Sequence, residues 1–200
     1  MQNTFSEQLL DLIKQRASIR RYQDKPVPKE ILDKIIEAGI WGPSLMAPGF
    51  QPWKFVVIQD AGKIKKLSEI MFVKSKQLGA GANVITRISA ETIASAKVLV
   101  VIYNCSAVVS FVKRINEDYM KMARQAEIAA ISAVIQNMIL VAEGFGLGSC
   151  WLDTPLFCKD GINEFVKPEG ELVAMLTLGY PAEKGKRCKR KPLSESVIYE

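Results

Sequence analysis

The chain has 200 residues, of which 48% are hydrophobic and 24% charged, and its formal net charge is +6. This length suits a single domain spanning residues 1–200, and the apolar content is ample for a buried core. The sequence contains no histidine, which excludes His-based catalytic triads, the usual zinc enzymes and any imidazole general base. If the protein is an enzyme, most of its chemistry must come from a group that it binds.

Membrane insertion and metal binding are both disfavoured. The longest uncharged stretches, 98–112 and 128–142, each have 15 residues, fewer than the roughly 20 apolar residues that cross a bilayer. The polar N-terminus does not resemble a signal peptide, so we expect a soluble, cytoplasmic protein. The spacing of the four cysteines fits neither a zinc nor an iron–sulfur site, and we predict buried free thiols and no metal.

An amphipathic helix is predicted over 5–16, and the stretch RASIRRY at 16–22 follows it. Arg16, Ser18 and Arg20 occupy every second position, and no acidic residue lies among them. On an extended backbone this alternation points all three side chains the same way, whereas on a helix Ser18 would point away. The first hypothesis is therefore an extended cradle for an anion.

The next elements follow in chain order. A second amphipathic helix is predicted over 27–41, a loop with three prolines and two glycines over 42–53, and a strand over 54–59. Helices are expected within 61–96. Two further apolar strands are predicted at 97–104 and 171–181.

The longest predicted element is a helix over 118–143, about 39 Å long. From Ile128 onward it is apolar on nearly every side, so it must cross the middle of the molecule or be covered by a partner. It ends at EGFGLGSCWLD, where three alternate glycines differ from a G-x-G-x-x-G dinucleotide fingerprint. We interpret Gly144 as a left-handed helix cap. These elements predict an α+β fold, with helices around a small sheet.

Two regions are basic without nearby acids, namely 16–22 and KRCKRK at 186–191. Each basic run alone is typical of a solvated surface patch. A basic nucleic-acid-binding domain is a further alternative interpretation. Two such runs far apart in sequence make a shared anion the more plausible interpretation. Trp41, Trp53 and Trp151 are interpreted as core residues rather than as rings stacked on a cofactor.

Four stretches, taken in order, carry a resemblance to a known family. They are RASIRRY, GPSLMAPGFQPWKFVVI, IQNMILVAEGFGLGSCWL and LGYPAEKGKRCKRKPLSESV. Together they resemble the FMN-dependent nitroreductase family along nearly the whole chain. The resemblance implies a mainly antiparallel central sheet flanked by helices, with the long helix buried at a homodimer interface.

The resemblance also implies a set of FMN-binding residues. Arg16, Ala17, Ser18 and Arg20 match the R-x-S-x-R segment that holds the phosphate and ribityl chain, with Arg20 near the pyrimidine edge. Arg190 matches the second phosphate contact, and bidentate guanidinium suits phosphate. Leu152 and Asp153 match the place where backbone N–H groups approach flavin N5 and O4.

Pro43 and Ser44 match a segment that reaches across the dimer interface to the flavin. The family pattern P-S-x-x-N-x-Q-P-W departs here, because Gln51 follows Pro43 two positions later than usual and Gly49 stands where the Asn would be. We keep Gln51 as a cofactor-binding candidate.

The resemblance implies an FMN-dependent NAD(P)H oxidoreductase. Electrons would pass by a ping-pong mechanism to a nitroaromatic, quinone or flavin acceptor, with no obligatory acid or base residue. The alternative is a protein that carries or senses FMN without efficient turnover. No nucleic-acid or membrane partner is expected.

Overall fold

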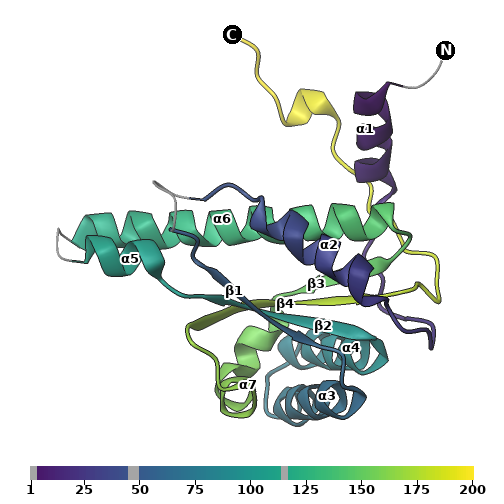
Figure 1. Ribbon diagram of the computed structural model, residues 1–200, viewed down its shortest axis with the longest axis vertical. Helices are drawn as coiled ribbons and strands as arrows, with labels where there is room; N and C mark the ends of the chain where they lie inside the picture. Colours follow the sequence, from purple (N-terminus) through teal and green to yellow (C-terminus); the bar gives the residue numbers. More distant parts are fainter. Residues whose placement is uncertain (1–3, 45–49, 114–116) are drawn as a thin grey trace.

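The computed structural model describes residues 4–44, 50–113 and 117–200. Gly49 lies outside these residues. A four-stranded sheet separates two layers of helices (Figure 1). The strands are β1 (Trp53–Ile58), β2 (Val98–Asn104), β3 (Gly148–Leu152) and β4 (Glu171–Gly179), in the spatial order β1-β2-β4-β3. Every pairing is antiparallel, which confirms the predicted α+β class.

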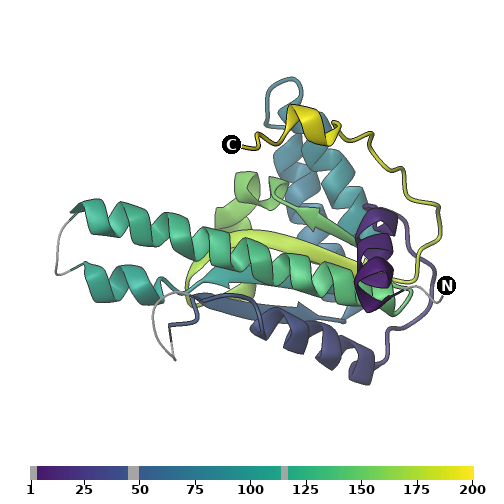
Figure 2. The same cartoon turned by 90° about the horizontal axis from the view of Figure 1, so that it is seen from above.

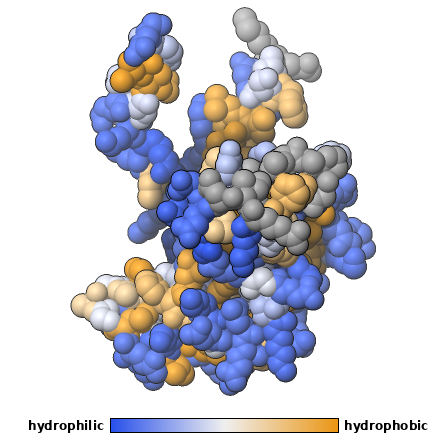
Figure 3. Space-filling model, turned by 90° about the vertical axis from the view of Figure 1, so that its left-hand side faces the viewer, coloured by the Kyte–Doolittle hydropathy of each residue, from blue (hydrophilic) through white to orange (hydrophobic). Residues whose placement is uncertain are grey.

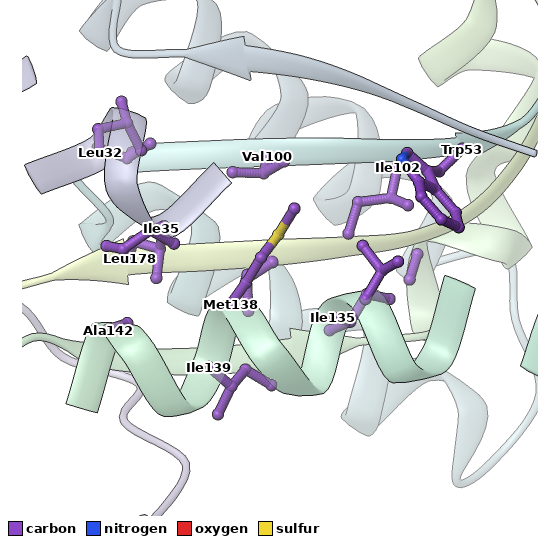
Figure 4. Packing of buried hydrophobic residues seen from close by; sticks show 14 of the residues in the cluster. Leu32, Ile35, Trp53, Val100, Ile102, Ile135, Met138, Ile139, Ala142 and Leu178 are labelled. Carbon is purple, nitrogen blue, oxygen red and sulfur yellow. The ribbon is translucent and has the colours of Figure 1, made fainter. Parts of the chain in front are cut away.

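Helices α2 (Lys29–Ile40) and α6 (Glu117–Gly144) cover one face of the sheet. Ile35 of α2 and Met138 of α6 meet the inward-facing Val100 and Leu178 of the two central strands (Figure 4). The side chains of these four residues are completely buried. One face of the apolar strand β2 and the apolar stripe of α2 thus help to build one half of the core.

The opposite face of the sheet carries α3 (Ala61–Ser75), α4 (Ala82–Ser95), the short helix η1 (Thr154–Cys158) and α7 (Lys159–Val166). Leu67, Met71 and Ile93 pack there against Leu99 and Val101 of β2. Because both faces of β2 are covered, all seven of its residues are buried, as its continuous apolar sequence indicates.

Three segments project from this sandwich. Helices α5 (Ala107–Val112) and the first half of α6 extend past the sheet at one end, while α1 (Phe5–Gln15) stands at the other (Figure 2). The C-terminal segment, with a short helix η2 (Leu193–Glu195), also stands away from the sheet. Figure 3 shows apolar side chains exposed on both α1 and the C-terminal segment.

Helix α1 has a complete capping box and yet no buried residue. Thr4 and Glu7 satisfy each other's backbone N–H groups at its start. Phe5 is 79% exposed, and Leu9, Leu10 and Ile13 are also exposed. The sequence predicts the helix correctly, but this chain alone does not cover its apolar face.

Helix α6 matches the predicted long helix to within one residue at each end. It is the one described helix long and apolar enough to cross a membrane, but its buried residues face the sheet and α2, and core helices give the same signal. Ile128 and Gln136 face outward. One face of α6 is therefore buried within this chain, and the other is left for the covering partner that the sequence analysis gave as the alternative.

Three smaller predictions are wrong. Gly144 is the last residue of α6, and the left-handed conformation occurs at Gly146, whose φ is 72°. Leu147 N–H then closes the end of the helix on Ala142 O. Trp41 is 81% exposed instead of lying in the core. Cys105 and Cys188 are exposed free thiols, whereas Cys150 and Cys158 are buried as predicted.

Candidate functional site

The arginine stretch 16–22 leaves α1 as an extended segment, as predicted. Ser18 forms a parallel bridge with Ser149 of β3, and Tyr22 forms an antiparallel bridge with Pro181 beyond β4. Ile19 N–H donates to Ser149 O at 2.9 Å. Ala17 and Ile19 are buried while Arg16 and Ser18 are half-buried and Arg20 is exposed. The alternation therefore places the three candidate side chains opposite the buried ones.

Tyr22 fixes this segment on the sheet through a buried hydroxyl. The Tyr22 hydroxyl donates to Ile19 O at 2.7 Å and lies 2.7 Å from Thr177 Oγ1. Burial raises the pKa of Tyr22, and the hydrogen bond to Thr177 opposes that rise. Since a buried hydroxyl without a partner is costly, this pair ties the arginine stretch to β4.

The C-terminal segment after β4 packs along the same stretch. Ala182 N–H donates to Arg21 O at 2.9 Å, and Glu183 Oε1 accepts from Arg20 N–H at 3.0 Å. A Cβ at Gly185 would lie 2.4 Å from Ala17 Cβ, so only glycine allows this close approach. These contacts bring the basic run 186–191 to the basic run 16–22.

Between them lies a cavity of about 640 Å³, which we call the cradle cavity. Its volume lies within the range of small-molecule sites, about 300–1,000 Å³. No acidic side chain is among its described lining residues, which carry six basic groups. They are Ile13, Lys14, Arg16, Ala17, Ser18, Arg20, Gln136, Lys186, Arg187, Cys188 and Arg190.

Two titratable groups lie next to the cradle cavity, and in both burial outweighs the effect of its arginines. Burial raises the pKa of Glu143 at the end of α6, while Arg16 and Arg187 act to lower it. Burial likewise raises the pKa of Cys150, opposed by Arg20, by a hydrogen bond with Ser18 and by Arg16. The Cys150 thiol therefore lies close to the three side chains of the predicted cradle.

A second cavity of about 710 Å³ adjoins the first and shares Ser18, Arg20 and Lys186 with it. We call it the α4 cavity, because one of its walls is the last half of α4. Its other lining residues come from α4 and from the two segments just described. They are Arg21, Tyr22, Ile88, Glu91, Thr92, Ser95, Ala182, Glu183 and Lys184.

The structure brings together half of the predicted site residues. Arg16, Ala17, Ser18, Arg20 and Arg190 line the cradle cavity. The remaining candidates, all of them described residues, line neither cavity: Pro43, Ser44, Gln51, Leu152 and Asp153.

The remaining candidates lie in three other places. Pro43 and Ser44 are exposed just beyond the end of α2, and Gln51 is exposed just before β1. Leu152 ends β3, and Asp153 directly precedes η1, where its carboxylate accepts from Trp151 Nε1 at 2.7 Å. Their roles stay predictions.

Several cavity residues were not among the predicted site residues. Lys186 and Arg187 belong to the basic run 186–191, so its composition could have identified them. Lys14 lies in the last turn of α1, two residues before Arg16. Gln136 is a polar residue within the apolar part of α6, and the sequence gives no reason to connect it with residue 16.

The comparisons with known proteins identify the family of the chain. The model of the nitroreductase family matches residues 13–180. A Methanothermobacter thermautotrophicus protein, provisionally named an NADH dehydrogenase/NAD(P)H nitroreductase, is 32% identical over 179 residues, which cover 88% of this chain and 78% of that protein.

Two solved structures extend the similarity to the whole fold. A BluB-like flavoprotein from Clostridium difficile superposes with a TM-score of 0.78 at 26% identity, over 96% of this chain and 98% of that one. A provisionally named nitroreductase from Desulfovibrio desulfuricans, solved in complex with FMN, gives a TM-score of 0.71 at 27% identity, over 96% of both chains. The chain therefore belongs to the nitroreductase family.

Proposed function

We propose that this protein is an FMN-dependent NAD(P)H oxidoreductase, and that the cradle cavity holds the FMN phosphate. The observation that carries the proposal is the convergence of Arg16, Ser18 and Arg190 on a cavity whose described lining residues include no acidic side chain. A phosphate monoester carries close to two negative charges and accepts several hydrogen bonds, which guanidinium and hydroxyl groups supply. The similar protein solved with FMN supports the choice of this phosphate compound.

The residues present fit such a group. Arg16 and Arg190 come from opposite ends of the chain and would grip the phosphate from two sides. The bridge to Ser149 fixes the Ser18 backbone at the wall of the cradle cavity. Arg20 would keep a positive charge at the pyrimidine edge of the flavin. The backbone N–H of Asp153 would approach flavin N5 and O4.

When bound, FMN would supply two-electron redox chemistry. The chain itself contributes position and charge. NAD(P)H and the acceptor, a nitroaromatic, a quinone or a free flavin, would use the site in turn by a ping-pong mechanism. The alternative is a protein that carries or senses FMN without efficient turnover.

The exposed apolar surface supports a homodimer. The apolar side chains of α1 are uncovered, and Trp41 is exposed beside Pro43 and Ser44. Obligate dimer interfaces resemble a core cut in half. A two-fold partner covering these surfaces would bring its own Pro43 and Ser44 toward the cradle cavity, which the same residues of this chain do not line.

The test is reduction of the purified protein under anaerobic conditions. The proposal expects a yellow protein whose flavin absorbance bleaches when NADH or NADPH is added and returns with a quinone or nitroaromatic compound. Bound flavin that neither reductant bleaches would favour the carrier or sensor instead. A colourless protein that does not bind added FMN would reject both.

A further inference from the structure

Arg20 is anchored by two side chains that come from distant parts of the chain. Its backbone N–H donates to Glu183 Oε1 at 3.0 Å, and its carbonyl oxygen accepts from Ser95 Oγ at 3.0 Å. Glu183 lies in the loop after β4, and Ser95 is the last residue of α4. All three residues line the α4 cavity, which shares Ser18 and Arg20 with the cradle cavity. We call Glu183 and Ser95 together the Arg20 clamp.

The residues on either side of Arg20 are held in a different way, by main-chain hydrogen bonds. Ile19 N–H donates to Ser149 O at 2.9 Å, and Arg21 O accepts from Ala182 N–H at 2.9 Å. Arg20 itself takes part in no such main-chain bond within the described residues. The clamp therefore supplies at Arg20 the contacts that main-chain pairing supplies to its neighbours.

The loop that carries Glu183 is fixed against the arginine stretch on both sides of this residue. Before it, Ala182 is bonded to Arg21. Two residues after it, a Cβ at Gly185 would lie 2.4 Å from Ala17 Cβ. The backbone of Glu183 therefore has a set place beside Arg20, and its carboxylate reaches the Arg20 N–H from there.

Glu183 binds the backbone of Arg20 and not its guanidinium. Within the part of the chain that the structure describes, the Arg20 guanidinium forms no ion pair with a carboxylate. Burial raises the pKa of Tyr22, and Arg20 acts to lower it while Glu183 acts to raise it further, so both charged groups lie near the Tyr22 hydroxyl. A carboxylate placed so near an arginine can neutralise it, but here it fixes the arginine and leaves its positive charge to the cavity.

We propose that Glu183 and Ser95 are positioning residues of the flavin site, which hold Arg20 where its charge favours the reduced flavin. This inference rests on the proposed function, which places Arg20 at the pyrimidine edge. A charge that is held in place before the reaction stabilises a developing charge better than a mobile one, because no free energy is spent on ordering it. The clamp thus acts on the reduction potential through Arg20, and neither clamp residue needs to contact the flavin.

The experiment compares reduction potentials between proteins of equal charge. Glu183→Gln and Glu183→Ala both remove the negative charge, but only glutamine keeps an oxygen that can accept from the Arg20 N–H. In potentiometric titrations of the flavin-loaded, full-length protein, the alanine variant should prefer reduced FMN about threefold less than the glutamine variant. This ratio corresponds to roughly 14 mV for a two-electron couple. Ser95→Ala changes no charge and should lower the potential of the wild type by about half as much.

A merely structural role predicts a different pattern. Loss of packing would lower the melting temperature of the apoprotein and leave the potential of bound FMN unchanged. Equal potentials in Glu183→Gln and Glu183→Ala would therefore overturn the role of Glu183, and an unchanged potential in Ser95→Ala would overturn that of Ser95. The matched control is Glu164, which is exposed on α7 and lines neither cavity. Its changes to Gln and to Ala should give equal potentials.

Arg20→Ala tests whether the clamp acts through Arg20. In this background Glu183→Gln and Glu183→Ala should have equal potentials, since the group that Glu183 positions is absent. A difference that persists without Arg20 would show that Glu183 acts on the flavin by another route, and would overturn the inference. Failure of the proposed function would look different. In that case neither NADH nor NADPH would bleach the flavin of the wild type, whereas these potentials are measured with a chemical reductant.

Discussion

Asn104 at the end of β2 donates its side-chain N–H to Glu127 Oε2 on α6 at 2.9 Å. Both side chains are buried, and Glu127 Oε1 accepts the backbone N–H groups of Val108 and Val109 at 2.7 and 3.1 Å. Three N–H donors therefore surround the carboxylate, which forms no ion pair with a described residue. This arrangement anchors the start of α5 to the middle of the projecting half of α6.

Glu127→Gln should lower the free energy of unfolding by about 1–3 kcal/mol. A glutamine presents one NH₂ group where the carboxylate had a second acceptor, so one of the N–H donors from Asn104 or Val108 loses its partner. Urea unfolding followed by circular dichroism measures the loss. The control Glu164→Gln changes an exposed acid of α7, and its free energy of unfolding should stay within about 0.5 kcal/mol of the wild type. Equal losses of stability in the two variants would contradict the anchoring role of Glu127.

Alkaline pH should destabilise the fold through buried neutral acids. Burial raises the pKa of Cys158 to about 11 and that of Tyr103 to about 12, from ordinary values of 9.0 and 10.0. A raised pKa means that the unfolded state releases its proton first, so stability is fully present below about pH 9 and is lost between about pH 9 and 12. Unfolding free energies measured across this range should fall accordingly.

Tyr103→Phe tests how much of this alkaline loss of stability comes from Tyr103. The Tyr103 hydroxyl is buried without a hydrogen-bond partner in the described part of the chain, so its removal should leave stability at pH 7 unchanged or increased. The variant should also lose on the order of 2 kcal/mol less than the wild type by pH 12. An identical alkaline decline in both proteins would show that Tyr103 does not titrate in this way.

Arg16→Ala and Arg190→Ala should weaken FMN binding far more than they disturb the fold. Each charge-assisted contact to phosphate is worth about 1.5–3 kcal/mol, which corresponds to roughly ten- to a hundredfold in the dissociation constant. FMN titration and melting of the apoprotein measure the two effects separately. If either variant keeps wild-type affinity, that arginine does not contact the phosphate.

Arg20→Ala should retain FMN but lower its reduction potential. The guanidinium is exposed and lines the cradle cavity, where a positive charge near the pyrimidine edge favours the more negative, reduced state of the flavin. The state that binds more tightly is the one favoured. Potentiometric titration of both proteins decides the point, and a potential that is unchanged or higher would contradict this role.

A hybrid dimer tests whether two subunits share each site. One subunit carries Arg16→Ala with Arg20→Ala, and the other carries Ser44→Arg. With shared sites, both defects fall in one site and the second stays intact, so flavin content should be about half that of the wild type and above either mutant homodimer. Light scattering first establishes the dimer; a monomer, or a hybrid no better than the homodimers, would exclude shared sites.

The sequence by itself determined the local elements of this protein. Helices α1, α2 and α6 and strands β1, β2 and β4 lie where periodicity predicted them, because alternation and helical spacing depend only on neighbours in the chain. The extended form of the arginine stretch follows from the same rule. The lack of histidine excluded an imidazole general base in advance, so that, for an enzyme, most of the chemistry was expected from a bound group.

Only the tertiary structure decided which of these parts meet. Arg20 and Glu183 are joined across 163 residues, and no local pattern encodes that contact. Gly185 permits it because a side chain there would collide with Ala17. The same packing brought Lys14, Gln136 and Arg187 to the cradle cavity and left Pro43, Ser44 and Asp153 away from it. Such contacts depend on the complementary shapes of surfaces that are distant in the sequence. The pattern of a single segment carries no information about those shapes.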